Sequence, residues 1–362
     1  LRMRCSTNWA IEARIIYYIR FFTLLQVFFS FLKKVFSIAF LFRLCYGKKV
    51  KTIIFVLSFF IFYMQYSTFQ SVIMERLEHD IPDPKRISIQ KVTKNNNIIL
   101  DGLSIMENDC NISPTLYLNY YYESYQQGAS FQNVYQSLLQ DYITHKPSKN
   151  IDPAFFTDFE NIRDKIAMKL IHYDRNHALL KKVPHVRFLD LAIVFYGLIS
   201  MDITQGNATI LIHQSHLQNW GIQTEELFQI AKDNTPHVLP ERLYDMNDVL
   251  HTLSESKDPS LNDIYPTDPY PMFVLTNETN LFGASCILYK NLLKNLAEEA
   301  QTDFYILPSS IHEVILVPTL ECSNYEELSN MVQEVNDTQL QDDEILSTHA
   351  YYYSRKANEI TM

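Results

Sequence analysis

The chain has 362 residues, of which 47% are hydrophobic and 20% are charged, and its formal net charge is -10. This composition excludes a disordered or fibrous protein, and the length is sufficient for one large domain or two small ones. The negative charge argues against a nucleic-acid partner, because affinity for phosphate comes mainly from clustered Lys and Arg.

Residues 1–63 differ in composition from the rest of the chain. They hold ten Lys or Arg and one acidic residue, Glu12, whereas the other 299 residues hold 21 bases and 40 acids. The apolar runs at 21–32, 35–42 and 52–64 are each shorter than the roughly 20 residues that span a bilayer as a helix. Continuous spanning helices are therefore poorly supported in this extension.

Three interpretations of the N-terminal extension are open: a membrane anchor through residues 21–63, an interfacial basic segment, or translated upstream sequence before a start at Met64. We favour the last, because the chain opens with Leu1 and its composition is uniform after Met64. We therefore expect a soluble cytoplasmic protein, with a membrane partner only if residues 1–63 belong to it.

Cysteine usage and motif content argue against a cofactor or a metal. Beyond residue 63 the cysteines are odd in number and widely spaced: Cys110, Cys286 and Cys322. There is no CxxC pair, no glycine-rich phosphate loop and no calcium-binding loop. We therefore expect reduced thiols in an intracellular protein, no cofactor and no metal site.

Residues 64–146 are predicted to form a first part that begins with a helix and a β-hairpin. Apolar residues at helical spacing in "FQSVIMERL" indicate an amphipathic helix. The stretch "RISIQKVTKNNNIILDGLSIM" indicates two strands joined at the asparagines 95–97, because Asn tolerates positive φ.

Two further helices are predicted in this part. Ser113 before Pro114 is typical of a helix start, and Gly128 lies where a C-terminal cap is expected. The second helix is predicted from Ser130 to about His145. We interpret a tyrosine stripe on the first of these helices as packing on a sheet rather than as a recognition surface. Its members are Tyr117, Tyr120, Tyr121, Tyr122 and Tyr125.

Residues 151–362 are predicted to form the main part, after the linker "PSKNIDP". A capping box of Thr157 and Glu160 predicts a helix through "NIRDKIAMKLI" to about Tyr173. "RFLDLAIVFYGLI" and "NATILIHQ" are predicted strands, and Thr224 is predicted to cap the helix "TEELFQIAKDN".

The C-terminal portion alternates further helices and strands. We predict a short helix at 246–253, an extended loop at 259–271, the helix "KNLLKNLAEEA", a helix with a capping box of Ser323 and Glu326, and a terminal hairpin in "YYYSRKANEIT". Because hairpins mix with helices instead of repeating a β-α-β pattern, we predict an α+β fold. It has a mostly antiparallel sheet with flanking helices, and an N-terminal helix and β-hairpin.

Several stretches make the chain resemble a known family. They are "VTKNNNIILDGLSI", "NISPTLYLN", "FLDLAIVFY", "NATILIHQSHLQNWG", "AKDNTP", "LFGASCILY" and "YILPSSIHEVILVP". Together they resemble the bacterial family catalogued as domain of unknown function 5688, over nearly everything from Met64 onward. The resemblance implies a soluble bacterial protein and carries no activity with it.

A looser likeness points to domain of unknown function 1444, on the order of elements and a few residues. Those residues are Trp220, Ala231, Asn234, Pro308 and His312.

The stretch 305–318 holds the first candidate site: Ser309, Ser310, His312 and Glu313. "HEVIL" resembles the start of a zincin signature, but position 316 is Leu where that signature needs a second His. A Ser nucleophile beside His312, oriented by Glu313 or Asp190, is conceivable. Ser-Ser after Pro is also ordinary turn composition, so we favour a structural hairpin.

The second candidate cluster is a possible ligand-binding site: His213, Ser215, His216 and Asn277. If the segment is helical, His213 and His216 share one face, next to Trp220. Hydrogen-bonded neutral histidines are commoner than sites, so we predict no metal here.

We expect a non-enzymatic protein that binds an unknown protein or small ligand. The tyrosine-rich helix is one candidate surface for that binding. One alternative is a hydrolase-like enzyme that uses Ser310 and His312. The other is a membrane-anchored variant through residues 21–63.

Overall fold

The computed structural model describes residues 64–81, 86–108, 110–146, 150, 152, 154–202, 206–246, 272–319 and 325–362. The chain divides into two compact units, and the division passes through a β-hairpin. The first unit contains the described residues up to Ser88, Leu103–Ile105 and Thr115–Ile143. The second consists of Ile89–Gly102, Met106–Pro114 and Thr144–Met362.

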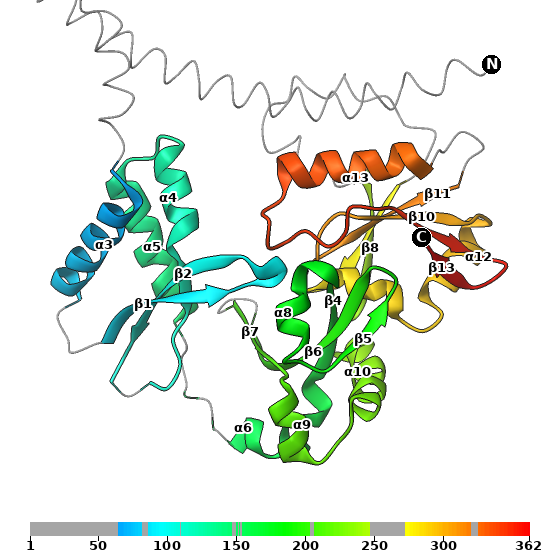
Figure 1. The fold of residues 1–362 in the computed structure, drawn as a ribbon, viewed down its shortest axis with the longest axis horizontal. Helices are drawn as coiled ribbons and strands as arrows, with labels where there is room; N and C mark the ends of the chain where they lie inside the picture. The colour runs from blue at the N-terminus through cyan, green and yellow to red at the C-terminus, as the bar shows by residue number, and fades with distance from the viewer. Residues whose placement is uncertain are drawn as a thin grey trace, which may run out of the picture. The chain divides into compact units, whose positions relative to one another are not determined.

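The N-terminal elements are three helices and a small sheet with strand order β1-β2-β3 (Figure 1). They are α3 (Tyr66–Asp80), β1 (Arg86–Thr93), β2 (Ile99–Met106), β3 (Thr115–Tyr117), α4 (Leu118–Gln126) and α5 (Phe131–His145). The predicted first helix and hairpin are confirmed. The helix predicted from Ser130 is confirmed too, and the Ser130 hydroxyl caps it by accepting the Asn133 N–H at 3.1 Å.

The hairpin turns through the three asparagines as predicted, in a short 3-10 segment, η1 (Asn95–Asn97). Asn96 and Asn97 have φ of 56° and 60°. This is the left-handed region, which Asn tolerates better than most residues because its short polar side chain can form local hydrogen bonds.

The helix predicted to start at Ser113 and Pro114 starts later, at Leu118. Residues Thr115–Tyr117 form β3 beside β2, and Leu116 and Leu118 are buried. Pairing with β2 and burial of these leucines therefore override the local capping signal.

The tyrosines of α4 pack within the first unit. The Tyr122 ring lies 5.0 Å from the Tyr66 ring and 5.3 Å from the Phe69 ring of α3. The Tyr121 hydroxyl donates to Asp141 of α5 at 2.6 Å. These contacts are internal, as we favoured, but their partners lie on helices and not on the predicted sheet.

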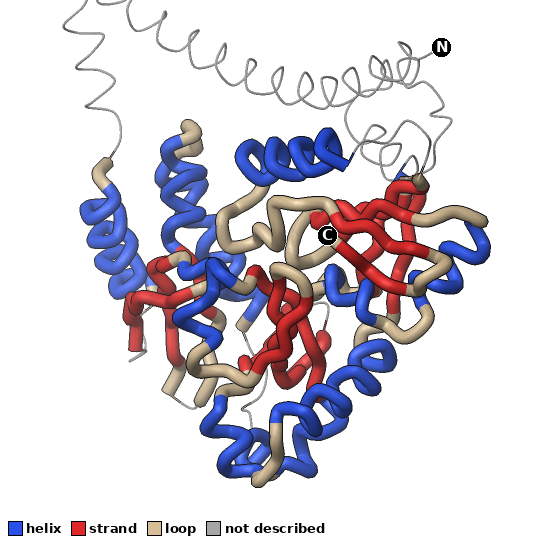
Figure 2. The backbone as a smooth tube through the Cα atoms, turned by 45° about the vertical axis from the view of Figure 1, so that its right-hand side comes forward, coloured by secondary structure: helices blue, strands red, loops and turns tan. Residues whose placement is uncertain are grey.

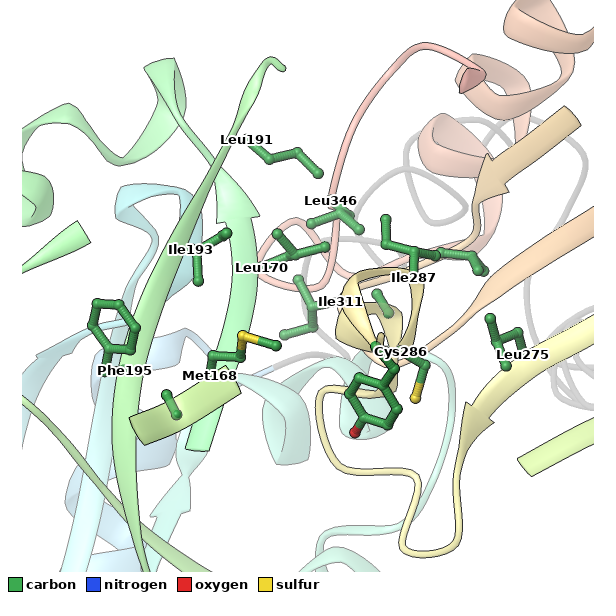
Figure 3. Packing of buried hydrophobic residues seen from close by; sticks show 14 of the residues in the cluster. Met168, Leu170, Leu191, Ile193, Phe195, Leu275, Cys286, Ile287, Ile311 and Leu346 are labelled. Atoms are coloured by element: carbon green, nitrogen blue, oxygen red, sulfur yellow. The ribbon is translucent and has the colours of Figure 1, made fainter. Parts of the chain in front are cut away.

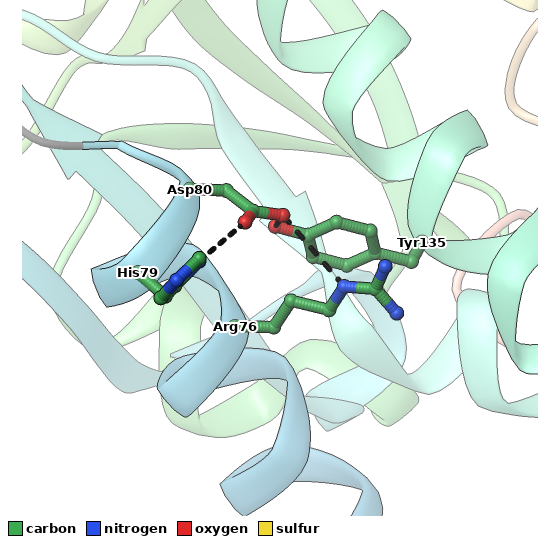
Figure 4. A network of polar contacts seen from close by, with 4 residues as sticks. All are labelled: Arg76, His79, Asp80 and Tyr135. Carbon is green, nitrogen blue, oxygen red and sulfur yellow. Dashed lines mark hydrogen bonds and ion pairs between the residues drawn. The ribbon is translucent and has the colours of Figure 1, made fainter.

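A polar network joins α3 to α5 inside this unit (Figure 4). The Tyr135 hydroxyl donates to Asp80 at 2.9 Å, and the Arg76 guanidinium lies 4.7 Å from the centre of the Tyr135 ring. Hydrogen bonds from His79 and Tyr135 lower the pKa of the Asp80 carboxyl. The network therefore favours an ionised carboxylate at the end of α3.

The second unit contains a four-stranded antiparallel sheet built around one long strand (Figure 1). The strands are β4 (Ile166–His172), β5 (His185–Phe188), β6 (Leu191–Asp202) and β7 (Gly206–Leu211). β4 pairs with one edge of β6, and β5 followed by β7 pairs with the other. The predicted strand "RFLDLAIVFYGLI" is therefore two strands, which turn at Leu189 and Asp190.

β4 occupies the second half of the segment predicted as a helix, so that prediction was wrong. The strand pairs with β6 along its whole length, from Ile166 opposite Gly197 to His172 opposite Leu191. Ala, Met, Lys and Leu favour a helix locally, but a full ladder and burial on both sheet faces stabilise the strand. Helical structure is confined to short turns ahead of it.

Helical segments precede, connect and follow these strands. They are α6 (Ala154–Thr157), α7 (Phe159–Ile162), η2 (Arg163–Lys165), η3 (Asp174–Asn176), α8 (His177–Leu180), α9 (Gln214–Trp220) and α10 (Thr224–Val238). Asp158 caps α7 in place of Thr157, because its carboxylate accepts the Glu160 N–H at 3.1 Å. Thr224 is the first residue of α10 and makes no cap.

A six-stranded sheet forms the rest of the unit, in the order β13-β12-β10-β11-β9-β8, with every pairing antiparallel. Its strands are β8 (Glu241–Asp245), β9 (Phe273–Asn277), β10 (Phe304–Pro308), β11 (Val314–Pro318), β12 (Tyr351–Ser354) and β13 (Glu359–Thr361). The helices around it are η5 (Gly283–Leu288), α12 (Leu292–Ala300) and α13 (Tyr325–Gln339). The hairpins predicted at 305–318 and at the C-terminus are confirmed, and so is the α+β class.

The main core of the second unit draws on both of its sheets (Figure 3). Met168 and Leu170 of β4 contribute from one sheet and Leu275 of β9 from the other, with Cys286 and Ile287 of η5 between them. The other face of the six-stranded sheet is covered by α13, which lies along β10 in Figures 1 and 2. Both faces of the central strands β10 and β11 are therefore largely buried.

Some predictions concern residues outside the described ranges. They are the extension 1–63, most of the linker 147–153, most of the short helix 246–253, the loop 259–271 and the capping residue Ser323. Within the described ranges, no helix combines the length and apolar character needed to cross a membrane.

Candidate functional site

The turn between β10 and β11 carries the first predicted cluster. Ser310 is buried, and its hydroxyl accepts the His312 N–H at 3.0 Å. The Ser309 hydroxyl donates to Glu313 at 3.3 Å. Both serines therefore hold the turn together, as the structural interpretation predicts. Among the described residues, no hydrogen bond joins the Ser310 hydroxyl to the His312 ring.

The His312 ring faces a second loop, which follows β9. Its Nδ1 lies 3.2 Å from the Phe282 N–H and 3.0 Å from the Asn280 carbonyl oxygen. The ring also stacks on the Phe282 ring, with centroids 5.5 Å apart and planes 15° apart. His312 is therefore oriented by the loop 277–282 and not by the serines.

Asn277, one of the predicted ligand-binding residues, organises this loop. It is fully buried, its Nδ2 donates to Leu281 O at 2.8 Å, and its Oδ1 accepts the N–H groups of Thr279 and Leu281. The structure thus brings Asn277 and His312 to the same loop, but the Asn277 amide is used to fix the loop.

The loop holds Phe282 in an unusual backbone conformation. Phe282 has φ of 53°, a region that is uncommon for bulky residues and costs free energy. The next residue is Gly283, where a Cβ would lie 2.5 Å from His312 O and 2.9 Å from Asn277 N. The absence of a side chain at Gly283 therefore lets the loop approach the turn closely enough for Phe282 to reach His312.

Lys169 of β4 reaches the same aromatic ring. Alternation along the strand puts it on the face of Ala167 and Ile171, which belong to two separate apolar clusters. Its Nζ lies 4.0 Å from the centre of the Phe282 ring and 5.9 Å from that of Tyr196. We call Lys169, Tyr196, Phe282 and His312 the Phe282 site.

Lys169 is a half-buried residue, and no carboxylate among the described residues balances the charge of its ammonium. Burial, and then the nearby ammonium of Lys94, lower its pKa to about 8. No carboxylate pairs with it anywhere in the part of the chain that the structure describes. The Tyr196 hydroxyl is buried and lacks a hydrogen-bond partner among those residues; the titratable group that acts on it is Cys286.

Lys94 is brought close to Lys169 by an asparagine network at the hairpin turn. Asn176 is buried, and its Nδ2 donates to Asn95 at 2.9 Å, to Asn96 at 3.1 Å and to His172 O at 2.8 Å. Its Oδ1 accepts the Asn96 N–H at 2.9 Å. One side chain therefore ties the hairpin turn to the end of β4.

We expect Asn176→Ala to lower the free energy of unfolding by about 2 kcal/mol, because it removes four hydrogen bonds to part-buried groups of the turn and of β4. Urea unfolding followed by circular dichroism measures this loss. The control Asn219→Ala, at an exposed position of α9, should stay within about 0.5 kcal/mol of the parent. Equal effects of the two substitutions would contradict the role of the network.

The second predicted cluster lies at the start of α9. The His213 N–H donates to His216 Nδ1 at 3.0 Å, and the His216 ring stacks on Trp220 with centroids 5.4 Å apart. Burial, and then His213, lower the pKa of His216. Ser215 is exposed. No hydrogen bond or ring contact within the described residues joins this cluster to Asn277 or His312.

Asp190, the suggested orienter of a hydrolase triad, is used elsewhere. It accepts hydrogen bonds from Ser347 and Tyr351, both at 2.7 Å. Across the described ranges, no group of three or more His, Cys, Asp or Glu side chains is arranged to hold a metal ion.

Comparison with known proteins identifies the family. The model of the Family of unknown function (DUF5688) matches residues 66–355. The chain belongs to this family. No curated protein and no solved structure gives a significant match to it. Inferences about the chemistry of this DUF5688 chain therefore rest on its own geometry.

The Phe282 site can provide a desolvated amine, an imidazole and aromatic faces within one small region. Sequence reasoning found His312 but missed Lys169 and Phe282. The available signal was one Lys inside the apolar run "IAMKLI". If that run is a strand, the Lys lies on a buried face. Because the run was predicted as a helix, burial of this Lys was not predicted.

Proposed function

We propose that this DUF5688 chain is a cytoplasmic, non-enzymatic protein that binds a small organic anion at the Phe282 site. One observation carries the proposal: the half-buried Lys169 ammonium has no carboxylate partner among the described residues. An uncompensated cation away from water costs free energy, so a protein gains by recruiting an anion to it. Aromatic faces beside it suit a ligand with an apolar body.

Charge around the site favours an anion over a cation. The charged group that acts on Lys169 is the ammonium of Lys94, which itself lies 3.8 Å from the Asp343 carboxylate. The Tyr196 ring packs against the Phe282 ring with centroids 5.1 Å apart. An intracellular setting is supported by the free thiols of Cys110 and Cys286.

The other candidate surfaces support the proposal less well. The rings of Tyr122 and Tyr125 on α4 are engaged with Phe69 of α3, so they offer less to a partner. Ser310 accepts a hydrogen bond from the backbone of its own turn, which leaves the hydrolase alternative without a base at the serine.

We test the proposal with benzoate and its neutral isostere benzamide. At a dissociation constant of about 1 mM, 10 mM benzoate adds about 1.4 kcal/mol of stability, or about 2 °C in Tm. Benzamide should add nothing measurable. Thermal unfolding followed by circular dichroism measures both shifts, and phenyl phosphate then compares a phosphate with a carboxylate.

Two variants control this experiment. Lys169→Met should lose the benzoate shift, whereas Lys294→Met, at an exposed position of α12, should keep it. If benzamide stabilises as well as benzoate, or if Lys169→Met keeps the full shift, the anion-binding proposal is wrong.

A further inference from the structure

We propose that Lys169 is a nucleophilic amine that forms a Schiff base with carbonyl compounds that carry an anionic group, such as oxo acids. The inference builds on the proposed anion-binding site and adds covalent chemistry to it. It rests on the position of the amine in the strand, on its neighbours and on the partial burial of the residue.

The position of Lys169 is rigid and partly dry. The residue lies mid-strand in β4, opposite Val194 of β6. Apolar clusters lie on both sides of it along the sheet face, one containing Ile171 and the other Ala167. The residue as a whole is half-buried and not fully enclosed. A backbone fixed by a full ladder holds a nucleophile in one place better than a loop does.

The neighbours of the amine favour its neutral form. Desolvation and a nearby cation are the two ways in which proteins activate a lysine amine, and both are present here. Desolvation comes from the apolar clusters and from the rings of Phe282 and Tyr196, and the cation is Lys94. In the described part of the chain, no carboxylate pairs with Lys169, although Asp343 pairs with Lys94 at 3.8 Å; the titratable rings at the site are His312 and Tyr196.

The protonation state follows from these contacts. With a pKa of about 8, roughly a quarter of the Lys169 side chains are neutral at pH 7.5, against about 0.1% for a lysine with the ordinary value of 10.5. A less basic amine is intrinsically a weaker nucleophile, which takes back part of this gain. We therefore expect Lys169 to react about tenfold faster than an exposed lysine.

The reaction balances without a redox partner. The nitrogen lone pair of Lys169 forms a bond to the carbonyl carbon, and the carbonyl π electrons move to oxygen. Proton transfer from nitrogen to that oxygen gives a carbinolamine. Loss of the oxygen as water forms the C=N bond. The imine nitrogen binds a proton from solvent and carries a positive charge, while the anionic group of the ligand remains near Lys94.

The experiment traps this imine in the full chain. Glyoxylate, an anionic aldehyde, and propionaldehyde, a neutral one, are each added with sodium cyanoborohydride. Cyanoborohydride transfers hydride to the imine and leaves a stable secondary amine. Mass spectrometry of peptides over time then gives the labelling rate of each lysine. We expect glyoxylate to label Lys169 about tenfold faster than the exposed Lys294 at pH 7.5.

Matched variants assign the reaction to the amine. Lys169→Arg keeps a positive charge but cannot form the imine, so its peptide should carry no label, while other lysines are labelled as before. Lys294→Arg should leave the labelling of Lys169 unchanged. If Lys169 is labelled no faster than Lys294 by either aldehyde, the covalent inference is overturned.

The two proposals can fail separately. If benzoate stabilises the chain but Lys169 is labelled slowly, the binding proposal stands and the Schiff base is excluded. If both aldehydes label Lys169 rapidly and equally and benzoate does not slow them, the reactive amine stands and the anion site is excluded. Preferential labelling by glyoxylate that benzoate inhibits supports both.

Discussion

Replacing Gly283 by Ala is expected to lower the free energy of unfolding by about 3 kcal/mol or more. The new Cβ would lie 2.5 Å from His312 O and 2.9 Å from Asn277 N, and it would also meet the Thr276 hydroxyl. Thr276 and Asn277 are buried, and the Thr276 hydroxyl donates to His312 O at 2.8 Å. None of them can move away cheaply, because the region is close-packed.

Gly221→Ala is the control for this prediction. Gly221 has φ of 71°, and nothing lies within 4 Å of a Cβ added there, so Ala pays only the cost of the left-handed conformation, about 1 kcal/mol. Urea unfolding compares the two variants. Equal losses would mean that the contact between the loop and the turn is less tight than the structure indicates. Gly283→Ala should also abolish the benzoate shift, since Phe282 is its neighbour.

Lys169→Met is expected to make the protein more stable at pH 7, by about 2 kcal/mol. The Lys169 pKa is about 8 in the folded chain and near 10.5 when unfolded, so the folded state disfavours the charged form. That difference corresponds to about 3 kcal/mol, and loss of the cation–π contacts returns about 1 kcal/mol. A binding residue that costs stability fits a site that awaits an anion.

The pH dependence gives this prediction a second measurement. The penalty on Lys169 is fully present below about pH 8 and is lost as pH rises towards 10.5, because the unfolded chain then binds more protons than the folded one. The parent protein should therefore gain stability relative to Lys169→Met across this window. The exposed control Lys294→Met should follow the parent within about 0.5 kcal/mol.

One outcome would contradict both proposals for Lys169. If Lys169→Met is no more stable than the parent, and the two proteins depend on pH in the same way, then the amine has an internal counter-charge. Neither the proposed anion binding nor the proposed reactivity of the Lys169 amine would then have a physical basis.

Local sequence signals predicted many elements because those elements depend on local physics. The asparagines at 95–97 supply the positive φ that the hairpin turn needs. The Ser130 hydroxyl caps α5, and two short apolar runs mark the strands of the hairpin at 305–318. The irregular order of hairpins and helices was enough to predict an α+β class.

Other elements were decided by pairing between distant segments. "IAMKLI" has good helix formers, yet it becomes β4 because β6 provides a ladder for every residue. Thr115–Tyr117 likewise becomes β3 because β2 lies beside it. No local pattern contains the partner strand, so propensity alone favoured the wrong state.

The sequence by itself determined the fold class, the family, the hairpin turns and the presence of a polar turn with His312. Only the tertiary structure decided that His312 turns away from Ser310 and stacks on Phe282, and that Lys169 reaches the same ring from β4. The physical reason is that each of these contacts joins residues at least 30 positions apart. They exist only once two sheets and the loop between them have packed, and the charge imbalance at Lys169 arises with them.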